Sequence, residues 1–137
     1  MIDRQTEWLL LNADAKALAT YSGGDLNVVP VSSIKLVDGK IWLIDYFMEK
    51  TSRNLSKSPS VSLVCWKAMI GFQVKGTCSY VTEGSDYDRA CEWIRSILPD
   101  RVVKGLLIID PTEICDIAPA KNSHEEINGY QRQGPQL

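Results

Sequence analysis

The segment from Asp45 to Asn54 reads Asp-Tyr-Phe-Met-Glu-Lys-Thr-Ser-Arg-Asn and combines residue types that can bind an anion. The pattern predicts that a strand ends at Asp45 and that a short helix begins near Lys50 and Thr51. Backbone N–H groups at a helix start favour negative charge, Lys50 adds a cation, and Thr51 or Ser52 adds a hydroxyl donor. This combination suits a phosphate. Taken alone, the segment favours the simpler interpretation, in which Thr51 is an ordinary N-cap and Lys50 a solvated charge.

A second candidate segment is the apolar stretch from Asn27 to Lys35, which carries Pro30 and two serines, Ser32 and Ser33. Proline cannot donate to a strand ladder, so Pro30 belongs at a sheet edge or an irregularity. A backbone at a sheet edge, together with small hydroxyl side chains, can form hydrogen bonds with the polar edge of a flat heterocycle. The competing interpretation is a simple amphipathic strand, which local sequence alone favours because such strands are abundant.

Several catalytic and metal-binding patterns are absent from the sequence. It has no glycine-rich phosphate loop, no Gly-x-Gly-x-x-Gly and no Gly-x-Ser-x-Gly. The four cysteines include no Cys-x-x-Cys pair, and His124 is the single histidine, so no metal site is predicted. The same thiols are expected to be reduced.

The length of 137 residues predicts one domain. With 15 basic and 17 acidic residues the formal net charge is −2, which gives no electrostatic basis for binding nucleic acid or an anionic membrane. The apolar runs are too short for a membrane span, and the N-terminus lacks a signal-peptide pattern, so a cytoplasmic protein is expected.

The elements that must position these residues are short strands with helices between them. Hydrophobic periodicity and turn residues predict helices over 3–15, 50–58 and 85–98, and strands over 17–21, 27–37, 41–45, 61–66, 72–81, 106–110 and 113–117. Ser85 is expected to cap the third helix. Tight turns at 22–25 and at Asp38-Gly39 predict antiparallel pairing, hence a barrel or an α+β sheet. Residues 1–118 form the expected domain and 119–137 a polar tail.

Taken together, the segments resemble the pyridoxamine-phosphate-oxidase-like FMN-binding split-barrel family. The resemblance runs from about Ala17 to Val81, and more weakly to Ile117, through pieces such as Asn-Val-Val-Pro-Val-Ser, Asp-Gly-Lys-Ile-Trp-Leu, Lys-Thr, Asn-Leu and Val-Lys-Gly-Thr. It implies a mainly β (α+β) fold, a six- to seven-stranded antiparallel split β-barrel with peripheral helices. It also implies a homodimer with FMN in a groove at the interface.

The resemblance also implies which residues contact FMN. Lys50 and Thr51 match the pair that holds the phosphate, and Ile44 and Asp45 match the end of a strand that touches the cofactor. The strand that lines the flavin matches Val31, Ser32, Ser33 and Ile34, and Asn54 is a weaker match. No catalytic residue is implied.

The chain departs from true pyridoxamine phosphate oxidases in one respect that concerns function. It ends in Gln-Arg-Gln-Gly-Pro-Gln-Leu and lacks their Arg- and Trp-containing substrate segment, so vitamin B6 oxidation is not expected. The prediction is an FMN-dependent oxidoreductase or reductase acting on a small molecule, with substrate and electron donor open. The alternatives are a non-enzymatic FMN-binding or electron-carrier protein, a member binding deazaflavin or haem, and a cofactor-free interaction module.

Overall fold

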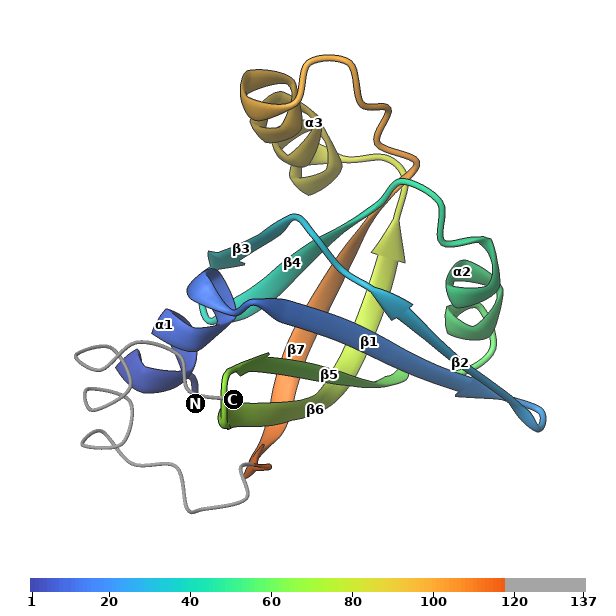
Figure 1. The fold of residues 1–137 in the computed structure, drawn as a ribbon. Helices are drawn as coiled ribbons and strands as arrows, with labels where there is room; N and C mark the ends of the chain where they lie inside the picture. The colour runs from blue at the N-terminus through green and yellow to red at the C-terminus, as the bar shows by residue number, and fades with distance from the viewer. Residues whose placement is uncertain (118–137) are drawn as a thin grey trace.

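The computed structural model describes residues 1–117, which form one antiparallel sheet and three helices (Figure 1). The expected tail over 119–137, with His124, lies outside the described residues. In chain order the elements are α1 (Arg4–Asn12), β1 (Ala15–Ser22), β2 (Asp25–Pro30), β3 (Ile34–Val37), β4 (Lys40–Asp45), α2 (Glu49–Leu55), β5 (Ser60–Lys67), β6 (Ile70–Val81), α3 (Ser85–Ile97) and β7 (Gly105–Asp116).

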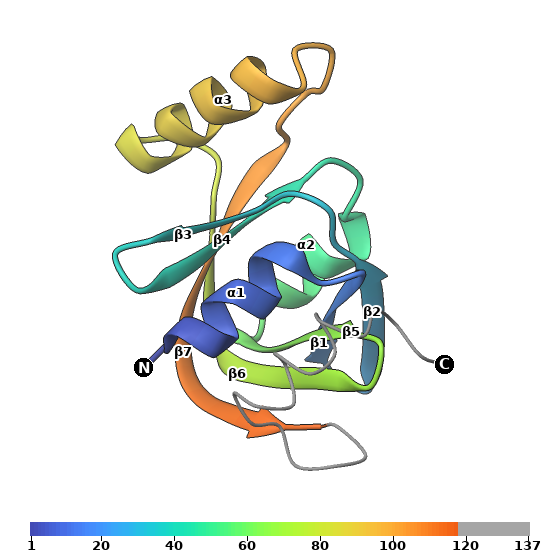
Figure 2. The same cartoon turned by 60° about the vertical axis from the view of Figure 1, so that its left-hand side comes forward.

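The seven strands follow the spatial order β2-β1-β5-β6-β7-β4-β3, and every neighbouring pair is antiparallel. The sheet curves around one apolar core, with β2 and β3 as its edges (Figures 1 and 2). The predicted mainly β fold, an antiparallel split barrel with peripheral helices, is confirmed.

Both predicted hairpin turns are present. Gly23 and Gly24 have φ of 55° and 84°, and Asp38 and Gly39 have φ of 52° and 78°. Two successive residues with positive φ match the right-handed twist of the flanking strands, which explains the Gly-Gly and Asp-Gly pairs. These turns set the registers of β1 with β2 and of β3 with β4.

The single strand predicted over 27–37 is wrong, because the chain changes partners in its middle. Strand β2 ends at Pro30, opposite Ala17 of β1, and β3 begins at Ile34, opposite Leu43 of β4. Between them, the Val31 N–H donates to the Lys16 carbonyl at 3.0 Å. A stretch that pairs with opposite edges of one sheet cannot be one straight strand.

Helix boundaries also differ from the prediction. Ala15, which was placed on the first helix, begins β1 opposite Trp66, and α1 ends at Asn12. The expected Ser85 cap is wrong, because Gly84 occupies the N-cap position and no side chain caps α3. Helix α2 begins at Glu49 and ends at Leu55, three residues earlier than expected.

The two last predicted strands form one strand, β7, with a bulge. Lys75 pairs with Glu113 and Gly76 pairs with Pro111, so Thr112 is the extra residue. Its hydroxyl donates to the Lys75 carbonyl at 3.2 Å. Proline lacks an N–H, and a bulge is a place where a ladder tolerates that loss. The pairing therefore continues past Pro111.

Each helix covers a different part of the sheet. Helix α1 contacts both β3 and β5 and buries Leu9 and Leu10 completely in the barrel core. Helix α2 contacts β1, β2 and β6. Helix α3 lies apart from the other two (Figures 1 and 2) and packs Ala90 and Ile94 in a second cluster with Trp42.

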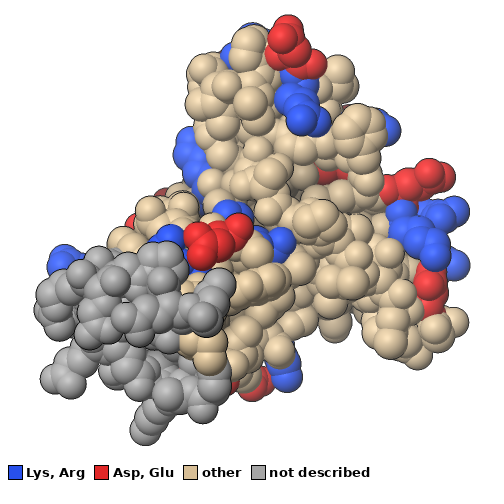
Figure 3. Space-filling view, in the orientation of Figure 1, with Lys and Arg blue, Asp and Glu red and all other residues tan. Residues whose placement is uncertain are grey.

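Charged side chains of both signs are interspersed on the face shown in Figure 3, and much of that face is uncharged. No helix within residues 1–117 is long and apolar enough to cross a membrane.

We expect Gly76→Ala to lower the free energy of unfolding by about 2–3 kcal/mol, as overpacking at a tight site does. A Cβ at this position would overlap the backbone carbonyl oxygen of Asp110, which cannot move without opening the β6–β7 ladder. Ser79→Ala, at an exposed position of the same strand, is the matched control and should change it by less than about 0.5 kcal/mol. Urea denaturation of both variants measures the difference, and equal stability would contradict this role for Gly76.

Candidate functional site

A pocket of about 280 Å³ lies where the segment after β2 meets the end of β4. It is mainly apolar and carries a few polar groups, as ligand pockets usually do. Its lining comprises Val29, Pro30, Ser32, Ile44, Tyr46, Phe47, Met48 and Arg101. Residues from three separate parts of the chain therefore surround one space.

Two predicted site residues meet in this pocket: Ser32 from the connection between β2 and β3, and Ile44 from β4. The Ser33 hydroxyl lies 2.8 Å from the hydroxyl of Tyr46, which also lines it. Val31 and Ile34 face the barrel instead: Val31 is buried in the core and Ile34 packs against it. Of the predicted 31–34 segment, Ser32 therefore lines the pocket, and Ser33 contacts the lining through the Tyr46 hydroxyl.

Asp45, at the end of β4, is only 3% exposed and accepts two hydrogen bonds. Its Oδ1 accepts from the Met48 N–H at 2.6 Å, and its Oδ2 accepts from the Tyr80 hydroxyl at 2.5 Å. The first bond constrains the chain that enters α2 and the second comes from β6. The contacts of Asp45 in this structure therefore hold the turn that carries Tyr46 and Phe47.

The Tyr80 ring occupies the space above Gly105, which pairs with Asp45 across β4 and β7. A Cβ on Gly105 would overlap the ring and hydroxyl of Tyr80, so glycine is needed for this close approach. Burial, the hydrogen bond to Asp45 and the negative charge of Asp45 together raise the pKa of Tyr80 well above its usual value. Tyr80 therefore stays a neutral donor at physiological pH.

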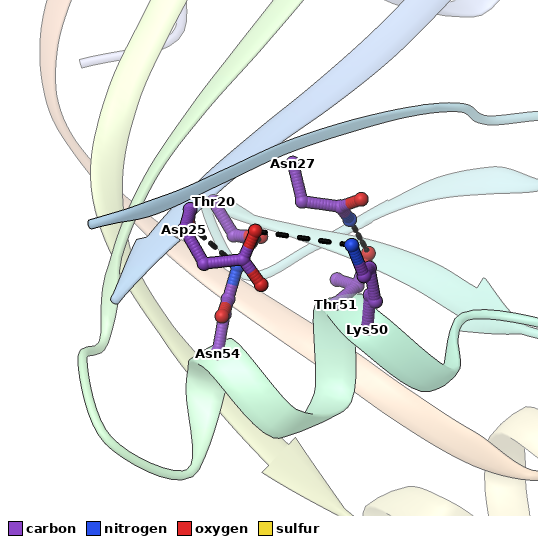
Figure 4. A network of polar contacts seen from close by, with 6 residues as sticks. All are labelled: Thr20, Asp25, Asn27, Lys50, Thr51 and Asn54. Carbon is purple, nitrogen blue, oxygen red and sulfur yellow. Dashed lines mark hydrogen bonds and ion pairs between the residues drawn. The ribbon is translucent and has the colours of Figure 1, made fainter. Parts of the chain in front are cut away.

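Helix α2 is attached to the β1–β2 hairpin by polar contacts (Figure 4). Thr51 is fully buried, and its hydroxyl accepts from the Asn27 amide at 3.0 Å. Asn54 is 5% exposed and its amide donates to the Thr20 hydroxyl at 3.1 Å and the Asp25 carbonyl at 3.3 Å. The two predicted residues Thr51 and Asn54 thus position α2 from inside.

The Lys50 side chain extends from α2 toward Asp25 of the hairpin, with Nζ 3.9 Å from Oδ1 (Figure 4). The two side chains are 58% and 50% exposed. An ion pair this open contributes about 0–1 kcal/mol, so it leaves Lys50 available to a stronger anion. Lys50 does not line the pocket, but its helix follows directly after Met48, which does.

The structure adds residues that the sequence patterns did not identify. Tyr46 and Phe47 lie inside the 45–54 segment that the sequence analysis selected as an anion site. An aromatic pair at the end of a strand could have indicated that both residues line a ligand pocket. Tyr80 and Arg101 come from 35 and more residues downstream, and no local pattern connects them with Asp45. Within residues 1–117 no group of three or more His, Cys, Asp and Glu side chains is placed to hold a metal ion.

The sequence profile of the pyridoxamine 5'-phosphate oxidase family matches residues 2–122. The chain belongs to this family. An uncharacterized protein of Methanocaldococcus jannaschii is 34% identical over 105 residues, covering 73% of this chain and 70% of that protein. The resemblance inferred from the strand, turn and Lys-Thr segments is thereby confirmed.

Solved structures of similar fold include proteins named for FMN and for heme. HupZ of Group A Streptococcus superposes with a TM-score of 0.79 and 23% identity over 90% of this chain and 99% of that one. An FMN-binding protein of Syntrophomonas wolfei superposes with a TM-score of 0.69 and 18% identity, over 82% of this chain and 83% of that one. HutZ, a heme storage protein of Vibrio cholerae, superposes with a TM-score of 0.66 and 13% identity, over 84% of this chain and 94% of that one. At these identities the likeness shows the fold alone.

We expect Tyr80→Phe to lower the free energy of unfolding at pH 7 by about 1–2 kcal/mol, because a buried carboxylate loses a hydrogen-bond donor. Tyr21→Phe, at a half-exposed tyrosine of β1, is the control and should change it by less than about 0.5 kcal/mol. Gly105→Ala should lower stability too, since it pushes on the Tyr80 ring while keeping the hydroxyl. Urea denaturation measures all three.

The same tyrosine predicts an alkaline loss of stability. A raised folded-state pKa means that the unfolded chain releases its proton first, so rising pH favours unfolding. Burial also raises the pKa of Cys65 from 9.0 to about 11 and of Cys78 to about 12, so the loss begins near pH 9. From its ordinary pKa of 10.0 upward Tyr80 adds to the slope. Tyr80→Phe should show a shallower fall between pH 10 and 11 than wild type or Tyr21→Phe, and an unchanged slope would contradict this assignment.

Proposed function

We propose that this protein binds FMN and acts as a flavin-dependent oxidoreductase or reductase on a small molecule. The observation that carries the proposal is the meeting of Ser32 and Ile44 in one pocket, beside a helix that presents Lys50. Family membership supports it, and the fold is shared with an FMN-binding protein. FMN would supply hydride exchange at its ring, so the protein needs to provide position and electrostatics.

The donors present fit the acceptors of FMN. In this proposal the flavin ring lies along the 31–34 segment, where Ser32 and Ser33 offer hydroxyl groups to its polar rim. The phosphate lies near Lys50, whose ammonium group is exposed and weakly paired. The contacts predicted for Ile44, Asp45, Thr51 and Asn54 belong to the same proposal.

The decisive comparison is between FMN and riboflavin, which lacks the phosphate. We expect Lys50→Ala to weaken FMN binding by about tenfold, because a half-exposed contact contributes a free energy at the low end of the range for charge-assisted hydrogen bonds. Riboflavin binding should be unchanged, because riboflavin has no phosphate for Lys50 to contact. Asp25→Asn should strengthen FMN binding a few-fold, because it removes a negative charge beside the phosphate. Flavin-fluorescence quenching measures each affinity.

Lys57→Ala is the matched control, because Lys57 is an exposed lysine just past the end of α2. Equal FMN affinity in wild type and Lys50→Ala would place the phosphate elsewhere. A purified protein whose released cofactor has the spectrum of haem or a deazaflavin would overturn the FMN proposal. Steady-state NAD(P)H oxidation with an added acceptor separates an enzyme from a flavin carrier.

The proposal includes a homodimer with FMN near the interface. Edge strand β2 exposes Leu26 and Val28 to 77% and 67%, next to Tyr21 of β1 at 51%. A stable dimer that buries such a surface needs an interface of about 2,000 Å² or more. The same strand begins at Asp25, the partner of Lys50, so this surface adjoins the proposed phosphate position.

The four free cysteines are consistent with a reducing, cytoplasmic location.

We expect sedimentation at micromolar concentration with FMN to give a dimer, and Leu26→Ser with Val28→Ser to shift it toward monomer. Both positions are exposed, so folding should be retained. Ile97→Ser is the control, since Ile97 is 53% exposed at the end of α3, away from the hairpin (Figure 1). A monomeric wild type, or a dimer insensitive to the double variant, would contradict this interface.

A further inference from the structure

A second pocket, of about 540 Å³, adjoins the first. It is lined by Tyr46, Phe47, Asp100, Arg101, Val102 and Lys104. Tyr46, Phe47 and Arg101 line both pockets, so ligands bound in the two would lie against one another. The volume falls within the range of about 300–1,000 Å³ found for small-molecule sites.

The lining pairs two cations with two aromatic rings. The Arg101 guanidinium carbon lies 5.4 Å from the centre of the Tyr46 ring, and Lys104 Nζ lies 5.1 Å from the centre of the Phe47 ring. Contacts of this kind orient the charged groups without neutralising them. Within residues 1–117 neither cation forms an ion pair, and Asp100 is the single carboxylate in the described lining. The pocket therefore carries an excess of positive charge.

The α3–β7 loop that supplies the cations is held by backbone contacts on several sides. The Arg101 N–H donates to the Leu98 carbonyl at 3.0 Å and the Lys104 N–H donates to the Asp45 carbonyl at 2.9 Å. The Tyr87 hydroxyl of α3 donates to the Val103 carbonyl at 2.8 Å. A loop fixed in this way has less conformational freedom to lose when a ligand binds.

We propose that this second pocket binds a planar anionic compound, an aromatic or conjugated carboxylate, as the substrate that meets the flavin. The Phe47 side chain is 79% exposed and offers a face for stacking, and a guanidinium group pairs with a carboxylate through two parallel hydrogen bonds. The assignment to a substrate rests on the proposed FMN function, because only a flavin in the first pocket gives the neighbouring site its redox partner.

The test uses 2-naphthoate as the probe and its neutral analogue 2-naphthamide as the matched ligand, titrated calorimetrically into the FMN-loaded protein. We expect naphthoate to bind wild type at least tenfold more tightly than naphthamide. Lys104→Gln and Arg101→Gln should each weaken naphthoate about three- to tenfold and change naphthamide less than twofold, as expected for exposed charged contacts. Arg95→Gln, an exposed arginine of α3 outside both linings, should match wild type.

FMN affinity, measured first on the same proteins, separates this inference from the proposed function. Suppose that FMN binds, but that wild type binds naphthoate no more tightly than naphthamide, or that neither substitution changes the affinity for naphthoate. The proposed substrate site is then wrong, and the proposed flavin site stands. If Lys104→Gln weakens FMN as much as naphthoate, the cations serve the cofactor and the inference is overturned. A chain that binds no FMN overturns both proposals.

Discussion

The burial of Asp45 constrains the centre of the candidate site, where the turn of Tyr46 and Phe47 meets β6 and the α3–β7 loop. Its side chain, at the end of β4, accepts from the N–H of Met48 and from the hydroxyl of Tyr80, and its carbonyl accepts from the N–H of Lys104. Removing a carboxylate from water is unfavourable unless its oxygens find donors. Those donors come from the turn into α2 and from β6, so satisfying the Asp45 carboxylate fixes the aromatic turn against β6. The separate bond from the Lys104 N–H to the Asp45 backbone carbonyl holds the α3–β7 loop beside that turn.

A second polar network does the same for α2. Thr51 and Asn54 are buried, and their bonds to Asn27, Thr20 and the Asp25 carbonyl leave the helix one orientation against the hairpin (Figure 4). Lys50, next to Thr51, is then presented outward. The division of roles is physical: buried amides and hydroxyls determine geometry, and an exposed cation on the same helix meets the solvent and any anion in it.

Family membership and fold do not by themselves select the cofactor, because one fold commonly carries several functions. Proteins named for FMN and for heme share this fold. The residues that line the two pockets distinguish this chain. Serine hydroxyls and a tyrosine lie at the first pocket, and two cations lie over aromatic rings at the second. A planar ligand with polar edges suits the first pocket, and a planar anion suits the second.

Local chemistry determined the parts that the sequence predicts. The turns at Gly23-Gly24 and Asp38-Gly39 require positive φ, which sets the two hairpins. Period-two alternation sets the buried face of β5 and β6. The segments around Ser32 and Lys50 stand out by residue type, but their assignment to a cofactor, like that of Ile44, came from the resemblance to the family. Contacts between distant residues decided the rest. The switch of partners between Pro30 and Ile34, the arrival of Tyr80 at Asp45 and the placement of Arg101 in the pocket arise from curvature of the whole sheet. No neighbouring residue encodes them, because they exist only once strands that are distant in the sequence lie together in the completed sheet.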